Sequence, residues 1–182
     1  MIDSSHSKHS DDRLILDNRD RNDLVATCGV SWKVATDTVM GELSSAKLAP
    51  SIIDDKPCLC LSGSVSLENN GGFVQASLDL IHDGTYCDAS RYAGVELEVR
   101  GDGKPCNVHL RTSSTEKVWQ SYRTGFVATE KWQVIRLPFD DFVPYRIDIP
   151  LDTATLRKLG IVSIGREGLV TICIGRLAFY RS

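Results

Sequence analysis

The chain has 182 residues, of which 42% are hydrophobic and 25% charged, and its formal net charge is −3. This length and composition are those of a single globular domain with a full hydrophobic core. A small negative charge without a lysine and arginine cluster argues against nucleic-acid binding, and no run reaches the ~20 apolar residues of a membrane span.

The first thirteen residues are polar and rich in Ser, His and Asp. This composition predicts a disordered leader over 1–13, followed by one domain over 14–182. The leader resembles neither a secretory signal nor an arginine-rich mitochondrial presequence. A cytoplasmic location is therefore expected, or a mitochondrial one only if a presequence has been removed.

Short β-type segments follow one another from Leu14 onward. The alternation of Val95, Leu97 and Val99 with charged residues is typical of a half-buried strand. One helical turn is expected near 152–159, because Asp152 is a good N-cap. About ten strands with almost no helix predict an all-β fold, an antiparallel β-sandwich or barrel. The expected strands are 14–16, 32–35, 58–67, 73–80, 95–99, 106–112, 118–127, 132–137, 160–164 and 170–180.

Turn residues separate several of these segments. The run Asn69-Asn70-Gly71-Gly72 predicts a hairpin, since Asn and Gly tolerate positive φ better than other residues. The run Gly101-Asp102-Gly103-Lys104 predicts a second hairpin-type connection. Residues 129–131 are expected to join a third pair of strands.

Six cysteines are present, and without a secretion signal three disulfides have little support. Cys58 and Cys60 are two apart in a strand-like run, so both side chains are expected on the same face. No CxxC pair suggests zinc. We therefore expect reduced, buried cysteines and no metal site.

Catalytic motifs are missing from the sequence. There is no Gly-x-Ser-x-Gly elbow, His82 belongs to a turn-like run, and His109 has no identifiable partner. The spacing of Asn18, Asp20 and Asn22 resembles an EF-hand loop, but its later ligand positions do not match. We expect no catalytic residue, no cofactor and no enzymatic activity.

A binding surface has better support. Asn107, His109 and Arg111 alternate with apolar residues on one strand and so occupy one face. If that strand pairs with the next, aromatic and arginine side chains share a sheet face, which suits sugars or protein partners. The alternative is an ordinary polar outer face, with Trp119 or Tyr122 turned into the core. The candidate binding residues are Asn107, His109, Arg111, Trp119, Gln120, Tyr122 and Arg123.

Several segments, in this order, resemble the CIA30 family, the complex I intermediate-associated protein 30 group. They are 37–41, 63–73, 94–103, 121–126 and 132–144. The chain departs from the family pattern at Glu42 and at 145–147, where relatives carry glycine. The marker residues expected to have a structural role are Trp32, Asp37, Met40, Gly41, Asn69, Asn70, Gly71, Gly72 and Phe73.

The resemblance implies a jelly-roll β-sandwich of the galactose-binding-domain-like type. It also implies a non-enzymatic binding module that binds protein or acts like a chaperone, with a role in assembling respiratory complex I, the NADH:ubiquinone oxidoreductase. Subunits or assembly factors of that complex are the implied partners. The alternative is a carbohydrate-binding module that uses the polar and aromatic sheet face.

Overall fold

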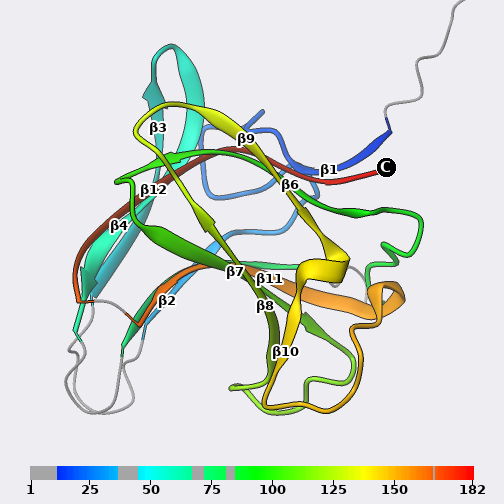
Figure 1. Ribbon diagram of the computed structural model, residues 1–182. Coiled ribbons are helices and arrows are strands. Elements are labelled where there is room, and N and C mark those ends of the chain that lie inside the picture. The colour runs from blue at the N-terminus through cyan, green and yellow to red at the C-terminus, as the bar shows by residue number, and fades with distance from the viewer. Residues whose placement is uncertain (1–11, 37–44, 67–71, 81–84, 166) are drawn as a thin grey trace, which may run out of the picture.

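Two antiparallel sheets of six strands each form the molecule, as described by a computed structural model over residues 12–36, 45–66, 72–80, 85–165 and 167–182 (Figure 1). The first sheet has the order β3-β4-β12-β6-β9, and β1 also pairs with β12. The second has the order β10-β8-β7-β11-β5-β2. The predicted all-β jelly-roll sandwich is thus confirmed. The strands are β1 (Arg13–Asp17), β2 (Lys33–Thr36), β3 (Ser45–Ile53), β4 (Lys56–Val65), β5 (Phe73–Asp79), β6 (Gly94–Gly101), β7 (Pro105–Thr112), β8 (Ser121–Val127), β9 (Gln133–Pro138), β10 (Val143–Tyr145), β11 (Leu156–Ile164) and β12 (Gly168–Tyr180).

The core lies between the two sheets and is built from alternate residues of each strand. Leu97 on β6 and Val108 on β7 are fully buried, whereas their neighbours along each strand point outward. Trp32, a marker residue of the sequence, is also buried in this core at 1% exposure. The opposite, outer faces of the sheets are therefore built from the intervening residues.

The three predicted hairpins are wrong. β4 and β5, which flank residues 69–72, belong to different sheets, and so do β6 and β7 and also β8 and β9. The two strands of each predicted pair thus lie in opposite layers of the sandwich, although residues 69–71 themselves lie outside the described residues. The period of two in a strand determines which residues face the core but not which strand lies alongside.

The hairpins that do occur are β3–β4 and β7–β8. The β3–β4 turn contains Asp54 and Asp55, both with positive φ, at 53° and 61°. Positive φ at both central residues is the geometry of a tight type I′ turn, which Asp tolerates. Sequence reasoning missed β3, because its residues Ser45–Ile53 mix polar and apolar types without clear alternation.

The predicted helical turn near 152–159 is shorter than expected. A 3-10 turn covers Thr153–Thr155, and Asp152 caps it by accepting a hydrogen bond from the Ala154 N–H at 3.0 Å. β11 then begins at Leu156, because this segment is hydrogen-bonded into the second sheet. A second 3-10 turn covers Phe139–Asp141. Among the described residues, none of the helices has the length and apolar character needed to cross a membrane.

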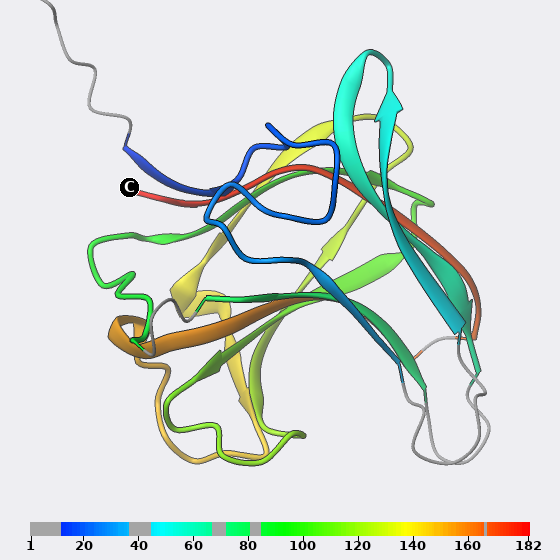
Figure 2. The same ribbon diagram turned by 180° about the vertical axis from the view of Figure 1, so that it is seen from behind.

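The chain forms a long loop between β1 and β2 (Figure 2), and a buried polar cluster holds this loop in place. Asp17 is fully buried and accepts hydrogen bonds from the Arg19 guanidinium at 2.8 Å and the Trp32 indole N–H at 2.8 Å. The Arg19 guanidinium also donates to the Arg21 carbonyl at 2.9 Å. Trp32 is thus fixed at its polar end by a carboxylate and at its ring by the core.

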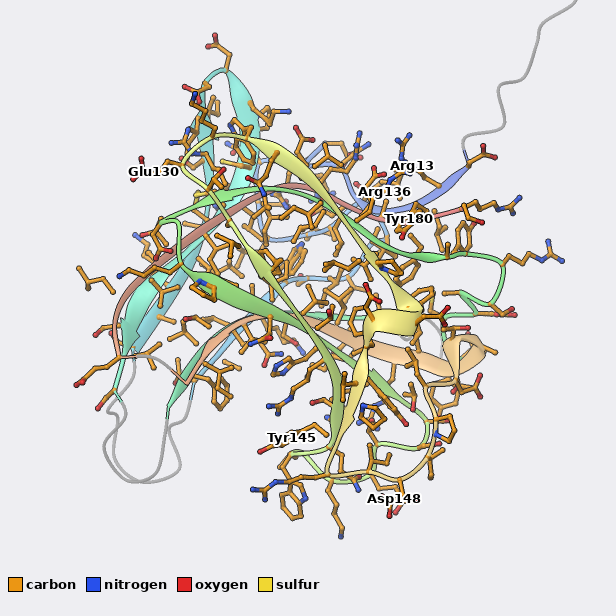
Figure 3. The ribbon with its side chains drawn as sticks, viewed as in Figure 1. Arg13, Glu130, Arg136, Tyr145, Asp148 and Tyr180 are labelled. Carbon is orange, nitrogen blue, oxygen red and sulfur yellow. A yellow bond between two sulfur atoms is a disulfide. The ribbon has the colours of Figure 1, made fainter. Side chains whose placement is uncertain are left out.

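The outer face of the first sheet carries a second ionic cluster. The buried Glu96 carboxylate contacts Arg13 at 2.8 Å, Arg136 at 3.0 Å and Arg176 at 2.9 Å. Arg136 also lies over the Tyr180 ring, 4.7 Å from its centroid. Figure 3 shows Arg13, Arg136 and Tyr180 together beside the C-terminal end of β12. The Glu96 carboxylate is thus paired with three arginines, which leave an excess of positive charge on this surface.

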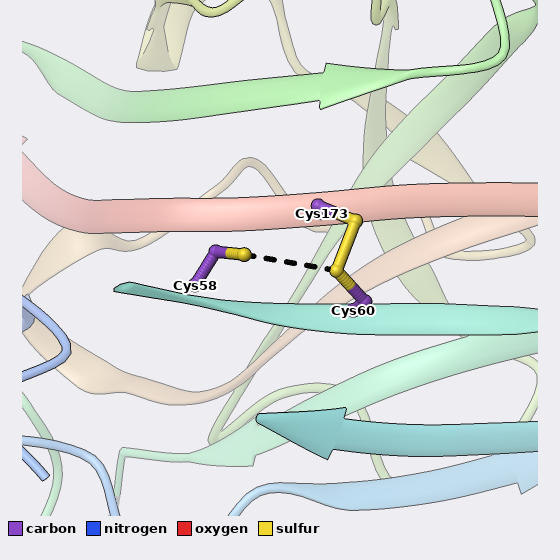
Figure 4. Close-up of side chains that lie close together, drawn as sticks. All are labelled: Cys58, Cys60 and Cys173. Carbon is purple, nitrogen blue, oxygen red and sulfur yellow. Dashed lines mark hydrogen bonds between the residues drawn. A yellow bond between two sulfur atoms is a disulfide. The ribbon is translucent and has the colours of Figure 1, made fainter. Parts of the chain in front are cut away.

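The expectation of reduced cysteines is wrong for two of the six. Cys60 on β4 and Cys173 on β12 form a disulfide, since the strand register places them directly opposite one another (Figure 4). Cys58, two residues from Cys60, lies on the same face with its Sγ 3.7 Å from the Cys60 Sγ, as predicted. Cys28, Cys58, Cys87 and Cys106 are free thiols. A partner 113 residues away cannot be recognised from local sequence.

Candidate binding face of the second sheet

The outer face of the second sheet is centred on β7. Asn107, His109 and Arg111 alternate with the buried residues Val108 and Leu110, so the three lie together on the outer face as the sequence predicts. His109 is directly opposite Arg123 on β8 and Gly160 on β11. The face therefore joins side chains from at least three strands around His109.

Tyr122 does not lie on this face, contrary to the prediction. Its ring is fully buried in the core, while Ser121 and Arg123 point outward. Adjacent residues of a strand point to opposite faces, so Tyr122 and Arg123 cannot share one. The Tyr122 hydroxyl donates to the Ile149 carbonyl at 2.6 Å and so ties the segment after β10 to the core.

Two strands that sequence reasoning did not connect to the site complete the face. Lys158 and Gly160 come from β11, and Gln75 comes from β5. The Gln75 side chain lies over Gly160, because a Cβ built at that glycine would be 2.2 Å from the Gln75 Nε2. The face depends on glycine here, since any side chain would displace Gln75.

The loop after β7 forms one rim of the face. The Arg111 guanidinium donates to the carbonyls of Thr115 and Lys117 at 2.9 and 3.0 Å and so holds this loop in place. Trp119, also predicted for the site, lies in this loop two residues before β8 and is 53% exposed. Gln120 accepts from the Lys117 N–H at 2.9 Å and donates to the Arg146 carbonyl at 3.2 Å.

The segment after β10 lies beside this loop at the same end of the sheet, because Tyr145 at the end of β10 pairs with Ser121 at the start of β8. Arg146 has a positive φ of 55°, which is uncommon for a residue other than glycine. A shallow depression of about 920 Å³ lies between this segment and the loop after β7, with Gln120, Arg146 and Asp148 in its lining. Its size is in the range of ligand sites. Figure 3 shows Tyr145 and Asp148 at this end of the sandwich, away from the Arg13 and Arg136 cluster.

Tyr145 and Arg123 are stacked at the edge of the face. The Arg123 guanidinium carbon lies 3.6 Å from the centroid of the Tyr145 ring, and the Arg123 Nε donates to the Ser121 hydroxyl at 2.8 Å. Burial lowers the pKa of Arg123 from its ordinary value. This arrangement fixes the guanidinium in orientation and leaves it at the face.

A small cavity of about 60 Å³ lies in the middle of the face. We call it the central pocket. Its lining includes Gln75, His109, Arg111, Gln120, Arg123 and Lys158. Gln120 also lines the large depression, so the pocket and the depression are neighbours. The pocket has about the liquid volume of two water molecules, so it can hold one small polar group.

His109 is buried beside this pocket and has an unpaired atom. The residue is 9% exposed, and no group in the described part of the chain hydrogen-bonds to its buried Nε2. Burial, with a further contribution from the Arg123 charge, lowers the pKa of His109 to about 3. The imidazole is therefore neutral at physiological pH, so it can form hydrogen bonds but carries no charge.

The depressed pKa of His109 makes the fold sensitive to acid. Above pH 6.5 the imidazole is neutral in both the folded and the unfolded chain. Below pH 6.5 the unfolded chain takes up a proton that the folded chain refuses until about pH 3. We expect this residue alone to lower the free energy of unfolding by about 2 kcal/mol between pH 7 and pH 5.

Urea unfolding of the wild type and of His109→Gln at both pH values checks this expectation. The variant should lose less stability than the wild type on acidification, by the amount given above. Equal losses in the two proteins would show that the imidazole is not desolvated in the folded state.

Another depression, of about 810 Å³, lies at the C-terminal end of β12, with Tyr92, Phe139 and Tyr180 in its lining. Among the side chains of its lining only Asp140 is charged, whereas Arg111, Arg123 and Lys158 all line the central pocket. The outer face of the second sheet therefore remains the better candidate.

The predicted residues are thus partly brought together. Five of the seven line or border the face, Trp119 is on its rim and Tyr122 is in the core. Gln75, Lys158 and Tyr145 were missed, since they lie far away in sequence and no local pattern relates them to β7.

Among the marker residues, Trp32, Gly72 and Phe73 are described, and Trp32 and Gly72 are buried. The others, Asp37, Met40, Gly41, Asn69, Asn70 and Gly71, lie outside the described residues.

Comparison with known proteins found one family and several similar structures. The family model described as complex I intermediate-associated protein 30 (CIA30) matches residues 26–174. The comparison with curated proteins found no significant match.

Several of the similar structures are carbohydrate-binding modules. The family 11 module of the cellulosomal cellulase Lic26A-Cel5E of Clostridium thermocellum has a TM-score of 0.72 and 11% identity, over 95% of this chain and 96% of that one. The family 11 module from Clostridium thermocellum in complex with a β-1,3-1,4-mixed-linked tetrasaccharide has a TM-score of 0.70 and 12% identity, over 93% and 96%. A family 30 module of the cellulase Cel9D-Cel44B of the same organism has a TM-score of 0.53 and 16% identity, over 76% and 90%. At these identities the likeness shows a shared fold.

Proposed function

Because the chain belongs to the complex I intermediate-associated protein 30 (CIA30) family and has the fold of carbohydrate-binding modules, we propose that it is a non-catalytic module that binds carbohydrate. The ligand lies on the outer face of the second sheet, in the depression beside Gln120 and over the central pocket. Sugars are recognised by fixed donors and acceptors in a shallow groove, and this face offers both.

The observation that carries the proposal is the unpaired Nε2 of His109. A buried polar atom without a partner costs free energy, and ligand-binding sites are where such atoms persist. His109 lines the central pocket, and Gln120 lines both this pocket and the neighbouring depression of ligand size. A hydroxyl or other polar group of a sugar entering the pocket would satisfy the Nε2 of His109.

Titration calorimetry with soluble neutral and acidic polysaccharides tests the proposal. Gly160→Leu should abolish binding, since a side chain at this position displaces Gln75 and fills the central pocket. Lys47→Ala, an exposed change on the first sheet, should bind like the wild type. Circular dichroism shows whether Gly160→Leu folds. A folded variant that binds as well as the wild type, or a wild type that binds no polysaccharide, would contradict the proposal.

A protein partner is the second candidate, and the family match favours it. Val118 and Trp119 are exposed side by side on the rim, at 83% and 53%, and tryptophan is enriched in protein interfaces. In this case the module acts in the assembly of NADH:ubiquinone oxidoreductase. Affinity capture from native membranes should enrich subunits or assembly proteins of that complex, and Trp119→Ala should weaken their capture. Capture without them would reject this role.

A further inference from the structure

The central pocket has a charge and a size that narrow the class of ligand. We infer that it binds one anionic substituent, a carboxylate or a sulfate ester, so that the ligand is an acidic polysaccharide. This inference rests on the proposed carbohydrate-binding function and specifies its ligand. The anionic substituent enters the pocket, and the remainder of the polysaccharide lies in the adjoining depression.

The pocket is lined by cations and by neutral groups. Arg111, Arg123 and Lys158 all contribute to its wall, and no aspartate or glutamate does. Within the described part of the chain, neither Arg111 nor Arg123 has a carboxylate within ion-pair distance. Lys158 contacts Asp79 at 3.7 Å, at the edge of the range for an ion pair. Three positive charges around one small cavity attract an anion.

The two arginines are held in place before any ligand arrives. Arg111 is fixed by the carbonyls of Thr115 and Lys117, and Arg123 by the Ser121 hydroxyl and the Tyr145 ring. These contacts are all to neutral groups, so they orient the guanidinium groups without neutralising them. Fixed guanidinium groups bind carboxylate or sulfate with little loss of side-chain entropy.

His109 is the independent observation that points to a ligand. The residue is more than nine-tenths buried and lines the pocket, and among the described residues its buried Nε2 has no hydrogen-bond partner. A neutral imidazole that carries its proton on Nε2 donates to an anion as well as to a hydroxyl. One oxyanion can therefore accept from His109 and from the two arginines at once.

The size of the cavity sets the limit on what enters. At about 60 Å³ the pocket admits a single carboxylate or sulfate but not a whole sugar ring, which must lie outside it. The glycine at position 160 and the Gln75 amide above it shape this wall. A neutral water in the pocket would satisfy His109 but would leave the arginine charges uncompensated.

The test compares four polymers by titration calorimetry at low and high salt. They are mixed-linked β-glucan, which is neutral, polygalacturonate, which carries carboxylates, dextran sulfate, and poly-glutamate as an acidic peptide. We expect the affinity for polygalacturonate or dextran sulfate to exceed that for β-glucan by about tenfold or more. Added salt should weaken the binding of the acidic polysaccharide. The acidic polysaccharide that binds more tightly shows whether the pocket prefers a carboxylate or a sulfate ester.

Arg123→Gln should reduce binding of the acidic polysaccharide by about tenfold or more, because one charge-assisted contact is lost. Lys47→Ala removes an exposed positive charge from the first sheet and should leave binding unchanged. As a readout independent of affinity, an anion in the pocket should raise the pKa of His109 in an NMR titration above its free value of about 3.

The outcomes separate the inference from the proposed function. Binding of β-glucan as tightly as the acidic polymers would overturn the inference and leave the carbohydrate-binding function standing. Binding of poly-glutamate without any polysaccharide would overturn both in favour of an acidic protein segment. Binding of none of the four would also overturn both. Equal weakening by Arg123→Gln and Lys47→Ala would show a diffuse charge effect and overturn the assignment to the pocket.

Discussion

Asp17→Ala is expected to lower the free energy of unfolding by about 4 kcal/mol, because the change leaves a buried charge without its partner. The Arg19 and Asp17 side chains are each 1% exposed, and their ion pair is 2.8 Å long. The substitution also removes the acceptor of the buried Trp32 indole N–H. Water cannot reach either group without loosening the segment between β1 and β2.

Urea unfolding of Asp17→Ala and of two other variants measures this effect. Asp17→Asn keeps an acceptor for Trp32 but loses the charge, so its stability should lie between those of the wild type and Asp17→Ala. Asp140→Ala, the same change at an exposed position, should lie within about 0.5 kcal/mol of the wild type. If Asp17→Ala and Asp140→Ala unfold at the same urea concentration, the buried cluster does not stabilise the fold.

Reduction of the Cys60–Cys173 disulfide is expected to cost about 4 kcal/mol of stability, near the upper end of the usual range. The bond joins residues 113 positions apart, so it restricts a large part of the unfolded chain. It also joins β4 to β12, two neighbouring strands of the first sheet. Unfolding with and without a dithiol reductant measures the difference.

A Cys60→Ser and Cys173→Ser double variant provides the control for this measurement. It should unfold like the reduced wild type, and reductant should not change it further. Cys58→Ser should retain the effect of reductant, because Cys58 is a free thiol. If reductant leaves the wild type unchanged, the two sulfurs are not bonded in solution.

The predicted strands correspond closely in position to observed strands. The predicted pairs of strands do not correspond to the observed pairs. β6 and β7 were recognised because Val95, Leu97 and Val99, and then Val108 and Leu110, alternate with polar residues. Whether they pair was decided by the long-range register, which places β6 beside β12 and β7 beside β11. Alternation along a strand shows which of its residues are buried. The same residues are buried whichever strand lies alongside, so alternation does not identify the partner strand.

The candidate site was likewise half predictable. His109 and Arg111 follow from the alternation within β7, and Arg123 follows from the next strand. Placing Tyr122 on the same face was an error that the period of two in a strand would have exposed. Lys158 is also on the face because β11 pairs with β7 over a separation of about fifty residues in the chain.

By itself, the sequence determined the all-β class, the face on which each β7 residue lies and, through the segments from Trp32 to Phe73, the family. These are local properties, since burial period, turn residues and motif order can all be read along the chain. Only the tertiary structure decided the disulfide, the placement of β4 and β5 in different sheets and the central pocket. Each depends on which distant strands become neighbours, and that choice is made by the packing of the whole sandwich.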